Sequence, residues 1–472
     1  MKTGRLTALA LSLVIAAGAA GCSYSPVETT AGIETAQTSA KAAVAETTAA
    51  ASESVPNETG TGSYAEKPAL EFKDSESGKL VVWSYNDELK DLIDAYLPGK
   101  DYEYVVFSSD EYKSRLDTAM ESGEAPDMFV CDYDYVRYYA NSDKTLSINA
   151  AGIPNKACSD MYDYTLRLAC DDSGNIKGLA WALSPSAVFY QKSLAQQYLG
   201  SSEPAQVAKE FSSWGSFLAA ARKVSKESEG GVKIITGTDE IFKSYLGSRS
   251  NPWKTDGKLH VDSVAEGYLG FSKTINSEKL TSGFRNGSDE WKAGMRNKTV
   301  LSYWGSLSFA RSSDFALDPA LIQKANPTSG DWGIVAPPGA FCSGGSWLMV
   351  SSNCDMKKSC ADIITAICCD QGNLRDMLAS GKCDFVNSRT VINAAASDER
   401  YEFAWLGGQN PYAVLGPVAD KTDVTPVGSD DPEINGVFSK IVSVYSAGGF
   451  KSVQDAKATF RELLIEKKIV KE

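Results

Sequence analysis

The chain of 472 residues contains only one histidine, His260, in the segment "DGKLHVDS". A Ser-His-Asp hydrolase would depend on this residue, and no G-x-S-x-G motif is present to hold a serine nucleophile. Catalytic zinc sites need histidine-rich ligand sets, and no Walker phosphate-binding loop occurs. A glycosidase needs only two carboxylates, which any acidic chain offers, and nothing specific supports one. We therefore expect a protein that is not an enzyme, uses no metal or cofactor, and carries His260 on its surface.

Positive charge is also scarce, because 47 Lys and Arg face 60 Asp and Glu and leave a formal net charge of −13. Nucleic acids and anionic lipid surfaces attract basic proteins, so neither is an expected partner. After the first 20 residues there is no apolar run long enough to span a bilayer, which takes about 20 apolar residues.

No C-x-x-C pair occurs among the ten cysteines, which argues against a structural zinc site or a thioredoxin-type site. Cys158 and Cys170, or Cys354 and Cys360, are close enough in sequence to pair. The other cysteines are expected to be small buried apolar groups, as free cysteine usually is.

The N-terminus has the pattern of an export signal. Lys2 and Arg5 precede a short apolar stretch, which ends in "AAGAAGC" at Cys22. The small residues before Cys22 resemble the lipobox of bacterial lipoproteins, in which the cysteine is acylated and becomes the new N-terminus. The alternative is an ordinary signal peptide with an incidental cysteine. We predict a lipoprotein signal peptide at 1–21 and an acyl anchor on Cys22, which holds a protein on a membrane without spanning it.

Residues 22–77 are rich in Ser, Thr, Ala and Glu and contain few large apolar side chains. Such a segment buries too little apolar surface to offset the entropy of ordering, so we expect a flexible tether. The remaining 395 residues are too many for one core and predict two lobes.

Apolar patterning from residue 78 onward predicts an α/β fold. Short β-branched runs at 79–83, 102–107 and 127–130 are typical of buried strands, and 86–97 and 110–123 have helical spacing. This alternation favours a mainly parallel sheet. Further helices are predicted at 212–226, 263–275, 437–445 and 453–464, with a strand at 232–236. The helical spacing of Trp214 and Phe217 predicts core packing for both.

The segments "KLVVWSYNDE" (79–88) and "SGEAPDMFVCD" (122–132) resemble the family 1 extracellular solute-binding proteins, the group that includes maltose-binding protein. These are the capture subunits of ABC importers. Further segments similar to the family follow in its order, namely 174–194, 214–224, 291–306, 331–339, 343–367 and 385–392. The chain departs from the family pattern at Ala180, Gln191, Val300, Leu301 and Asn387.

The resemblance implies the two-lobed periplasmic-binding-protein fold, with a hinge and a central ligand cleft. The first lobe would comprise 78–150 and 300–350, and the second 151–299 and 351–472. Closure of such lobes around a ligand is a hinge motion.

Candidate ligand residues follow mainly from the family's loop positions. An aromatic face accepts the C–H face of a sugar ring, and polar side chains bind its hydroxyl groups. The candidates are Trp83, Tyr85, Asn86, Asp132, Tyr133, Trp181, Trp304, Trp347 and Arg389. Core packing remains the alternative for each tryptophan, and a solvated loop carboxylate the alternative for Asp132. Trp253 and Trp405 are expected to be rim residues or loop anchors.

These patterns together predict a monomeric, lipid-anchored protein on the outer face of the cell membrane. It would capture a sugar or oligosaccharide and deliver it to the membrane subunits of an ABC permease. The alternatives are a binding protein for another solute, such as a polyamine or peptide, and a surface lipoprotein with a hydrolase or scaffold role.

Overall fold

The structure is a computed structural model that describes residues 70, 72–75, 78–312, 317–318 and 326–471. The chain separates into two units, Met1–Ser63 and Tyr64–Glu472, and the first lies wholly outside the described residues. The predicted signal peptide, Cys22 and nearly all of the predicted tether therefore lie outside them as well.

Within the described residues, seven strands form one mixed sheet with the order β2-β1-β3-β9-β4-β7, and β8 pairs with β4 beside this path. A separate hairpin contains β5 (Lys254–Thr255) and β6 (Lys258–Leu259). The strands of the large sheet are β1 (Leu80–Ser84), β2 (Tyr102–Val106), β3 (Met128–Asp132), β4 (Gly178–Gln191), β7 (Ser302–Ser306), β8 (Trp332–Val335) and β9 (Phe341–Val350).

The pairing corrects the prediction of a mainly parallel sheet. β1 pairs in parallel with β2 and β3, as the strand–helix alternation predicts. β9 instead runs antiparallel to both β3 and β4, and β4 runs antiparallel to β7 and β8. The long strands β4 and β9 add antiparallel strands to the parallel part of the sheet. The hydrophobic pattern of a short sequence segment does not show which distant strand it pairs with, so the sequence did not predict these antiparallel pairs.

The helices of the first 250 residues are α2 (Glu88–Tyr96), α3 (Ser109–Ser122), α4 (Val136–Ala140), α5 (Asp163–Leu168), α6 (Lys192–Leu194), α7 (Pro204–Glu210), α8 (Trp214–Glu227) and α9 (Phe242–Leu246). The later helices are α10 (Ser263–Ser277), α11 (Asp289–Arg296), α12 (Leu307–Arg311), α13 (Lys357–Ile364), α14 (Gln371–Ala379), α15 (Arg389–Ala396), α16 (Tyr412–Lys421), α17 (Asp431–Ser446) and α18 (Val453–Glu466). Among these described helices, none has the length and apolar character that a bilayer crossing requires.

Most of the predicted elements are confirmed within a few residues, but the strand predicted at 232–236 is wrong. That segment makes only single bridges, Lys233 with Val300 and Ile235 with Thr281, so it forms no extended ladder. A glycine and an aspartate shape the turn between α3 and β3. Gly123 ends α3 with a φ of +80°, a conformation that suits glycine, and the Asp127 carboxylate accepts a 2.9 Å hydrogen bond from the backbone N–H of Val81.

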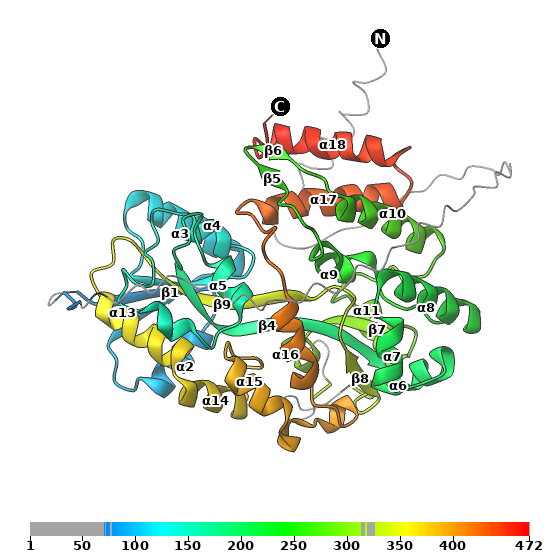
Figure 1. Ribbon diagram of the computed structural model, residues 1–472, viewed down its shortest axis with the longest axis horizontal. Coiled ribbons are helices and arrows are strands. Elements are labelled where there is room, and N and C mark those ends of the chain that lie inside the picture. The colour runs from blue at the N-terminus through cyan, green and yellow to red at the C-terminus, as the bar shows by residue number, and fades with distance from the viewer. Residues whose placement is uncertain (1–69, 71, 76–77, 313–316, 319–325, 472) are drawn as a thin grey trace, which may run out of the picture. The chain divides into compact units, whose positions relative to one another are not determined.

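The buried side chains form two clusters on either side of the long strand β4. The first cluster includes most buried residues of 80–187 and 347–424, and the second includes most buried residues of 188–280 and 434–470. Along β4, Ala187 and Phe189 belong to the first cluster and Val188 to the second, because successive strand side chains point to opposite faces. Figure 1 shows β4 running between the blue-to-cyan elements and the green ones, with α16 beside it.

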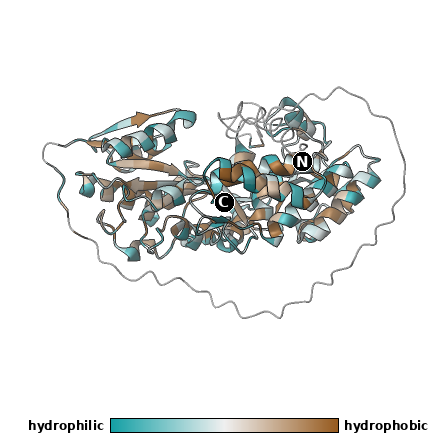
Figure 2. Ribbon diagram, turned by 90° about the horizontal axis from the view of Figure 1, so that it is seen from above, coloured by the Kyte–Doolittle hydropathy of each residue, from teal (hydrophilic) through white to brown (hydrophobic). Residues whose placement is uncertain are grey.

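These clusters divide the chain differently from the lobes predicted from the sequence, since buried residues of 151–187 and 354–424 pack with those of 80–150. A packing cluster does not define a unit that moves as a rigid body, so the lobe boundaries stay a prediction. In Figure 2 brown marks strands and stretches of several helices, and teal alternates with brown along the helices.

The nine cysteines that the structure describes are all free thiols. Eight of them are buried, as expected for small apolar groups. The Cys354 and Cys360 sulfur atoms lie 3.7 Å apart without a bond, and Cys158 and Cys170 are not bonded either.

Candidate functional site

Five of the nine predicted ligand residues come together where β1 and β3 end. Trp83, Tyr85 and Asn86 lie at the end of β1, and Asp132 and Tyr133 lie at the end of β3. β1 and β3 are parallel neighbours, so their carboxyl ends meet at one edge of the sheet. In open α/β sheets, ligands bind outside the carboxyl ends of the strands. We call these five residues the strand-end group.

Side chains in the strand-end group are held in place but keep accessible surface. Each of the five is half-buried. The Trp83 ring packs edge-on against Phe107 with centroids 4.7 Å apart, and the Tyr85 ring packs edge-on against Tyr112 at 5.5 Å. Rings supported on one side and accessible on another suit contact with a flat apolar surface of a ligand.

Ser346 belongs to the same place, although no pattern in the sequence selects it. Its Oγ lies 3.1 Å from the Tyr85 Oη, and in the sheet register it stands opposite Asp132. A serine in the run "SGGSW" becomes a site residue only because β9 pairs antiparallel with β3. Sequence patterning does not show this pairing, so it offered no signal for Ser346.

Two ionisable members of the strand-end group are shifted toward their neutral forms. Burial raises the pKa of the Asp132 carboxyl above its usual value, and the nearby Asp134 carboxylate adds to the shift. One Asp132 oxygen accepts a 2.9 Å hydrogen bond from the backbone N–H of Asp134. Burial also raises the pKa of Tyr85, so its hydroxyl stays protonated and keeps a hydrogen to donate.

Lys243 brings helix α9 to this edge of the sheet. Its Nζ lies 3.0 Å from an Asp134 oxygen and donates a hydrogen bond of 3.3 Å to the Ser343 carbonyl. The same ammonium lies 5.2 Å from the centroid of the Tyr133 ring. Lys243, Tyr133 and Asp134 also line an open pocket whose other walls are the segment after α9, the start of β9 and residues 422–435. The strand-end group is therefore continuous with a pocket.

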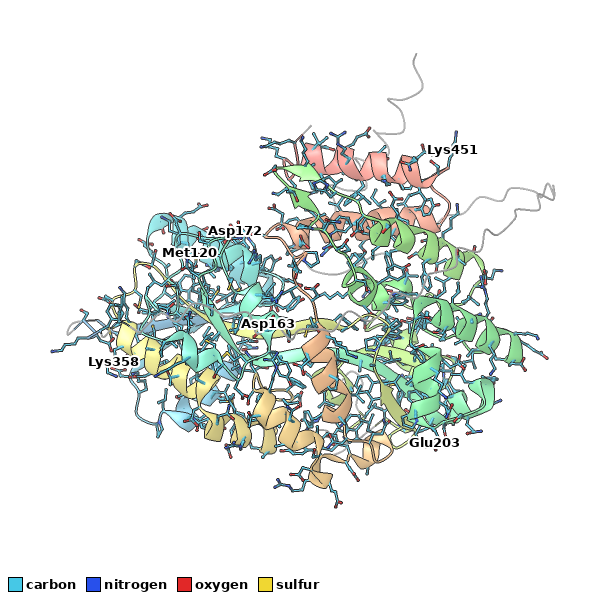
Figure 3. The ribbon with its side chains drawn as sticks, viewed as in Figure 1. Met120, Asp163, Asp172, Glu203, Lys358 and Lys451 are labelled. Atoms are coloured by element: carbon cyan, nitrogen blue, oxygen red, sulfur yellow. The ribbon has the colours of Figure 1, made fainter. Side chains whose placement is uncertain are left out.

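The tryptophans predicted from later motifs are placed differently. Trp181, Trp304 and Trp347 are 2%, 6% and 0% exposed. Trp304 stacks on Trp214 with centroids 5.9 Å apart, and Trp347 donates a 3.2 Å hydrogen bond to the carbonyl of Thr165 on α5. Helix α5, marked by Asp163 in Figure 3, packs against β4. In this conformation the three rings have almost no surface to offer a ligand, and their ligand role stays a prediction.

Other aromatic and basic predictions also have defined places. Arg389 donates a 2.8 Å hydrogen bond to Asp420 and another to the carbonyl of Met161, and its guanidinium lies 5.0 Å from the Tyr162 ring centroid. Arg389 thus joins the start of α15 to α16 and to residues 161–162, and its predicted ligand role is untested. Trp253 and Trp405 are buried loop anchors, and His260 is exposed as expected.

An acidic region that the sequence did not single out adjoins Asn86. Burial raises the pKa of Glu88, and the negative charge of Asp384 contributes to that shift. Burial likewise raises the pKa of Asp384, although Arg311 forms an ion pair with it and opposes the shift. No local motif links residues 88 and 384, because only the fold brings them together.

Glu240, in the 3₁₀ turn η3 (Thr238–Ile241), is a further enclosed carboxyl. Its side chain is half-buried, and burial raises its pKa to about 8. One of its oxygens accepts a 2.9 Å hydrogen bond from the backbone N–H of Thr236.

The site region as a whole offers aromatic faces, hydroxyl groups and carboxyls. Across the described ranges, no group of three or more His, Cys, Asp or Glu side chains is arranged to hold a metal ion.

Comparison with known proteins places the whole chain, rather than this group of side chains, among proteins already described. Residues 91–399, well over half of the chain, match the family model described as bacterial extracellular solute-binding protein. Among the curated proteins, no sequence matches the chain.

Solved structures of similar fold are numerous. An extracellular solute-binding protein of family 1 has a TM-score of 0.70 at 17% identity, covering 83% of this chain and 99% of that one. The sugar-binding protein MalE from Xanthomonas citri has a TM-score of 0.64 at 13% identity, covering 83% and 98%. A galacto-N-biose-/lacto-N-biose I-binding protein from Bifidobacterium longum, in complex with lacto-N-biose, has a TM-score of 0.62 at 16% identity, covering 84% and 99%. The chain thus has the two-lobed α/β fold of periplasmic binding proteins.

Proposed function

Because the chain belongs to the family of bacterial extracellular solute-binding proteins, whose members bind substrates and are not enzymes, we propose that it captures a sugar or oligosaccharide for an ABC importer. The observation that carries this proposal is the strand-end group, which gathers two supported aromatic rings, an amide and a carboxyl where parallel strands end.

The chemistry of the group fits a sugar. The half-buried faces of Trp83 and Tyr133 suit the apolar C–H face of a pyranose ring. The Tyr85 hydroxyl, the Asn86 amide and the Asp132 carboxyl supply both donors and acceptors for ring hydroxyl groups. The sugar ligand of the Bifidobacterium relative supports a carbohydrate for this chain too.

Capture would involve closure of two lobes, which we place at 78–150 with 300–350 and at 151–299 with 351–472. The contacts of Lys243 with Asp134 and Ser343 join α9 to the edge that carries the strand-end group. They are the contacts that we expect to break and re-form as the cleft opens and closes.

Delivery and anchoring complete the proposed function. The export signal at 1–21, acylation of Cys22 and the tether at 22–77 would hold a monomeric binding protein on the outer face of the membrane, within reach of the permease subunits. Metabolic labelling with a fatty acid tests the anchor, because a Cys22→Ala variant should carry no label.

The acidic region favours a second candidate, which is a cationic solute such as a polyamine. The Glu88 and Asp384 carboxyls of this region and the Asp132 carboxyl of the strand-end group have raised pKa values, because partial loss of water disfavours their charged forms. A bound cation would favour the charged carboxylates again and would be attracted by them.

The experiment is a calorimetric titration of residues 70–472 with mono- and oligosaccharides and, in parallel, with spermidine. A saturable response to a sugar that is weakened by Asp132→Asn supports the first proposal. Saturable binding of spermidine alone supports the second. Tyr138→Ala, an exposed aromatic residue on α4, is the matched control and should bind as the unmodified protein does.

A further inference from the structure

A second cavity lies beside the pocket described above. Its walls are the residues after α9, the link between β8 and β9, and the end of α16, and they include Arg249, Gly339 and Lys421. Lys421 forms no ion pair with a carboxylate in the described part of the chain. Asp423 is the one acidic residue in this lining, against the two cations Arg249 and Lys421.

Arg249 is the unusual residue of this cavity. It is only 6% exposed, and it lines both this cavity and the neighbouring pocket. Its Nη2 donates a 2.9 Å hydrogen bond to Asp431, while its Nε and Nη1 are buried without a hydrogen-bond partner. Buried N–H groups of a charged side chain are rarely left unpaired, because the loss of water must be compensated.

The surroundings hold the guanidinium in place without satisfying these two nitrogens. Its central carbon lies 4.2 Å from the centroid of the Trp253 ring, and the Trp253 indole N–H is fixed by Asn435 at 2.8 Å. Asp262 is near enough to influence the charge of Arg249, but its oxygens accept hydrogen bonds from the backbone N–H groups of Ala265 and Ser250. The described residues therefore supply no hydrogen-bond acceptor to the Nε and Nη1 of Arg249.

We propose that Arg249 and Lys421 form a binding site for a small oxyanion, of the phosphate or carboxylate class, in the cavity between α9, the β8–β9 link and α16. A guanidinium is well suited to such groups, because its N–H donors match the spacing of phosphate and carboxylate oxygens. The exposed ammonium of Lys421 adds attraction at the rim of the cavity. Arg249 also lines the pocket that adjoins the strand-end group, so the proposal is tested on protein without sugar.

The test is titration of the sugar-free protein with inorganic phosphate and, separately, with acetate, at constant ionic strength set by chloride. Calorimetry measures binding directly, so its result does not depend on a change in stability. A saturable signal for phosphate alone assigns the site to phosphate, and equal saturation by both anions assigns it to oxyanions in general.

Variants assign the signal to these residues. Arg249→Gln alone leaves the buried Asp431 unpaired, so the double variant Arg249→Gln with Asp431→Asn keeps the shape and removes both charges. We expect it to weaken anion binding at least tenfold and Lys421→Gln to weaken it about threefold, a loss typical of one exposed charge. Lys451→Gln, at an exposed lysine marked in Figure 3, is the control and should bind as the unmodified protein does.

Two results would overturn the proposal. One is a response to phosphate and acetate that stays linear with concentration. The other is saturable binding of equal strength in the unmodified protein and the double variant. Sugar binding, present or absent, changes neither outcome.

Discussion

Trp83 and Trp304 are both candidate ligand residues from the sequence, but the structure exposes part of one and buries the other. Trp83, at the end of β1, keeps part of its ring accessible and rests against Phe107. Trp304, in the middle of β7, stacks on Trp214 and contacts Phe211 and Phe217 inside the second cluster. Of these two candidate ligand residues, only Trp83 keeps surface that a ligand could contact.

The difference arises from how each strand is covered. Every residue of β7 is buried. Two successive residues of this strand, Tyr303 and Trp304, belong to the first and the second cluster respectively. A strand covered on both faces buries each side chain in turn. β1 is also buried along its length on one face, but the chain leaves the sheet at Ser84 and carries Tyr85 and Asn86 beyond it. Among the candidate aromatic residues, those near the end of a strand therefore keep accessible surface, while those within a fully covered strand do not.

The largest expected effect is on folding. Trp304→Ala should lower the free energy of unfolding by about 3–5 kcal/mol, because it removes a large buried side chain and leaves a cavity. Urea denaturation measures this loss. A decrease below about 1 kcal/mol would show that Trp304 is not packed as the structure has it.

The next effect separates binding from folding. Trp83→Ala should weaken sugar binding about 10- to 100-fold, or roughly 1.4–2.7 kcal/mol, while costing less stability than Trp304→Ala. Calorimetry and denaturation on the same samples give both numbers. Unchanged affinity in this variant would remove Trp83 from the site.

We expect the stability of the protein to depend on pH through Glu240, with a smaller effect than the two substitutions above. Its pKa of about 8 in the folded protein lies above the usual value of 4.5, so the folded state binds the proton more tightly. This contribution to stability is complete below pH 4.5 and is lost as the pH rises through 8. Since the side chain keeps some exposure, we expect a loss of about 1–2 kcal/mol between about pH 5 and pH 8.5 that Glu240→Gln does not show.

Denaturation of both proteins at the two pH values measures this difference. The amide oxygen introduced by Glu240→Gln would still accept the hydrogen bond from Thr236, so the comparison isolates the charge. Parallel pH profiles for the two proteins would contradict the raised pKa.

The smallest expected effect concerns Tyr85. Tyr85→Phe removes the contact between its hydroxyl and Ser346 and should cost about 0.5–1.5 kcal/mol of unfolding free energy. A larger loss of sugar affinity than of stability would show that the hydroxyl binds the ligand. Ser346→Ala tests the same contact from the other strand.

The sequence predicted what depends on local pattern. Periodicity located the helices and strands between residues 79 and 130. Five of the nine candidate ligand residues, named mainly from the family's loop positions, lie together where β1 and β3 end. Ser346, Glu88 with Asp384, and the antiparallel course of β9 could not be predicted in this way, because each depends on contacts between segments more than 200 residues apart.

Trp181, Trp304 and Trp347 were predicted as ligand residues but are buried, which also shows that local sequence patterns do not determine long-range packing. Their motifs place them near strands, but which face they occupy is decided by β4, β7 and β9 and by the helices that cover those strands. Pattern alone does not distinguish a ring that lines a cleft from one that fills a core.

The most direct test of the strand-end group is the affinity of residues 70–472 for a panel of oligosaccharides, measured by calorimetry with Trp83→Ala and Asp132→Asn alongside. We expect saturable binding of at least one sugar, weakened tenfold or more in both variants and unchanged in Tyr138→Ala. Binding of a sugar with equal affinity in all four proteins would contradict the assignment of the strand-end group as the ligand site.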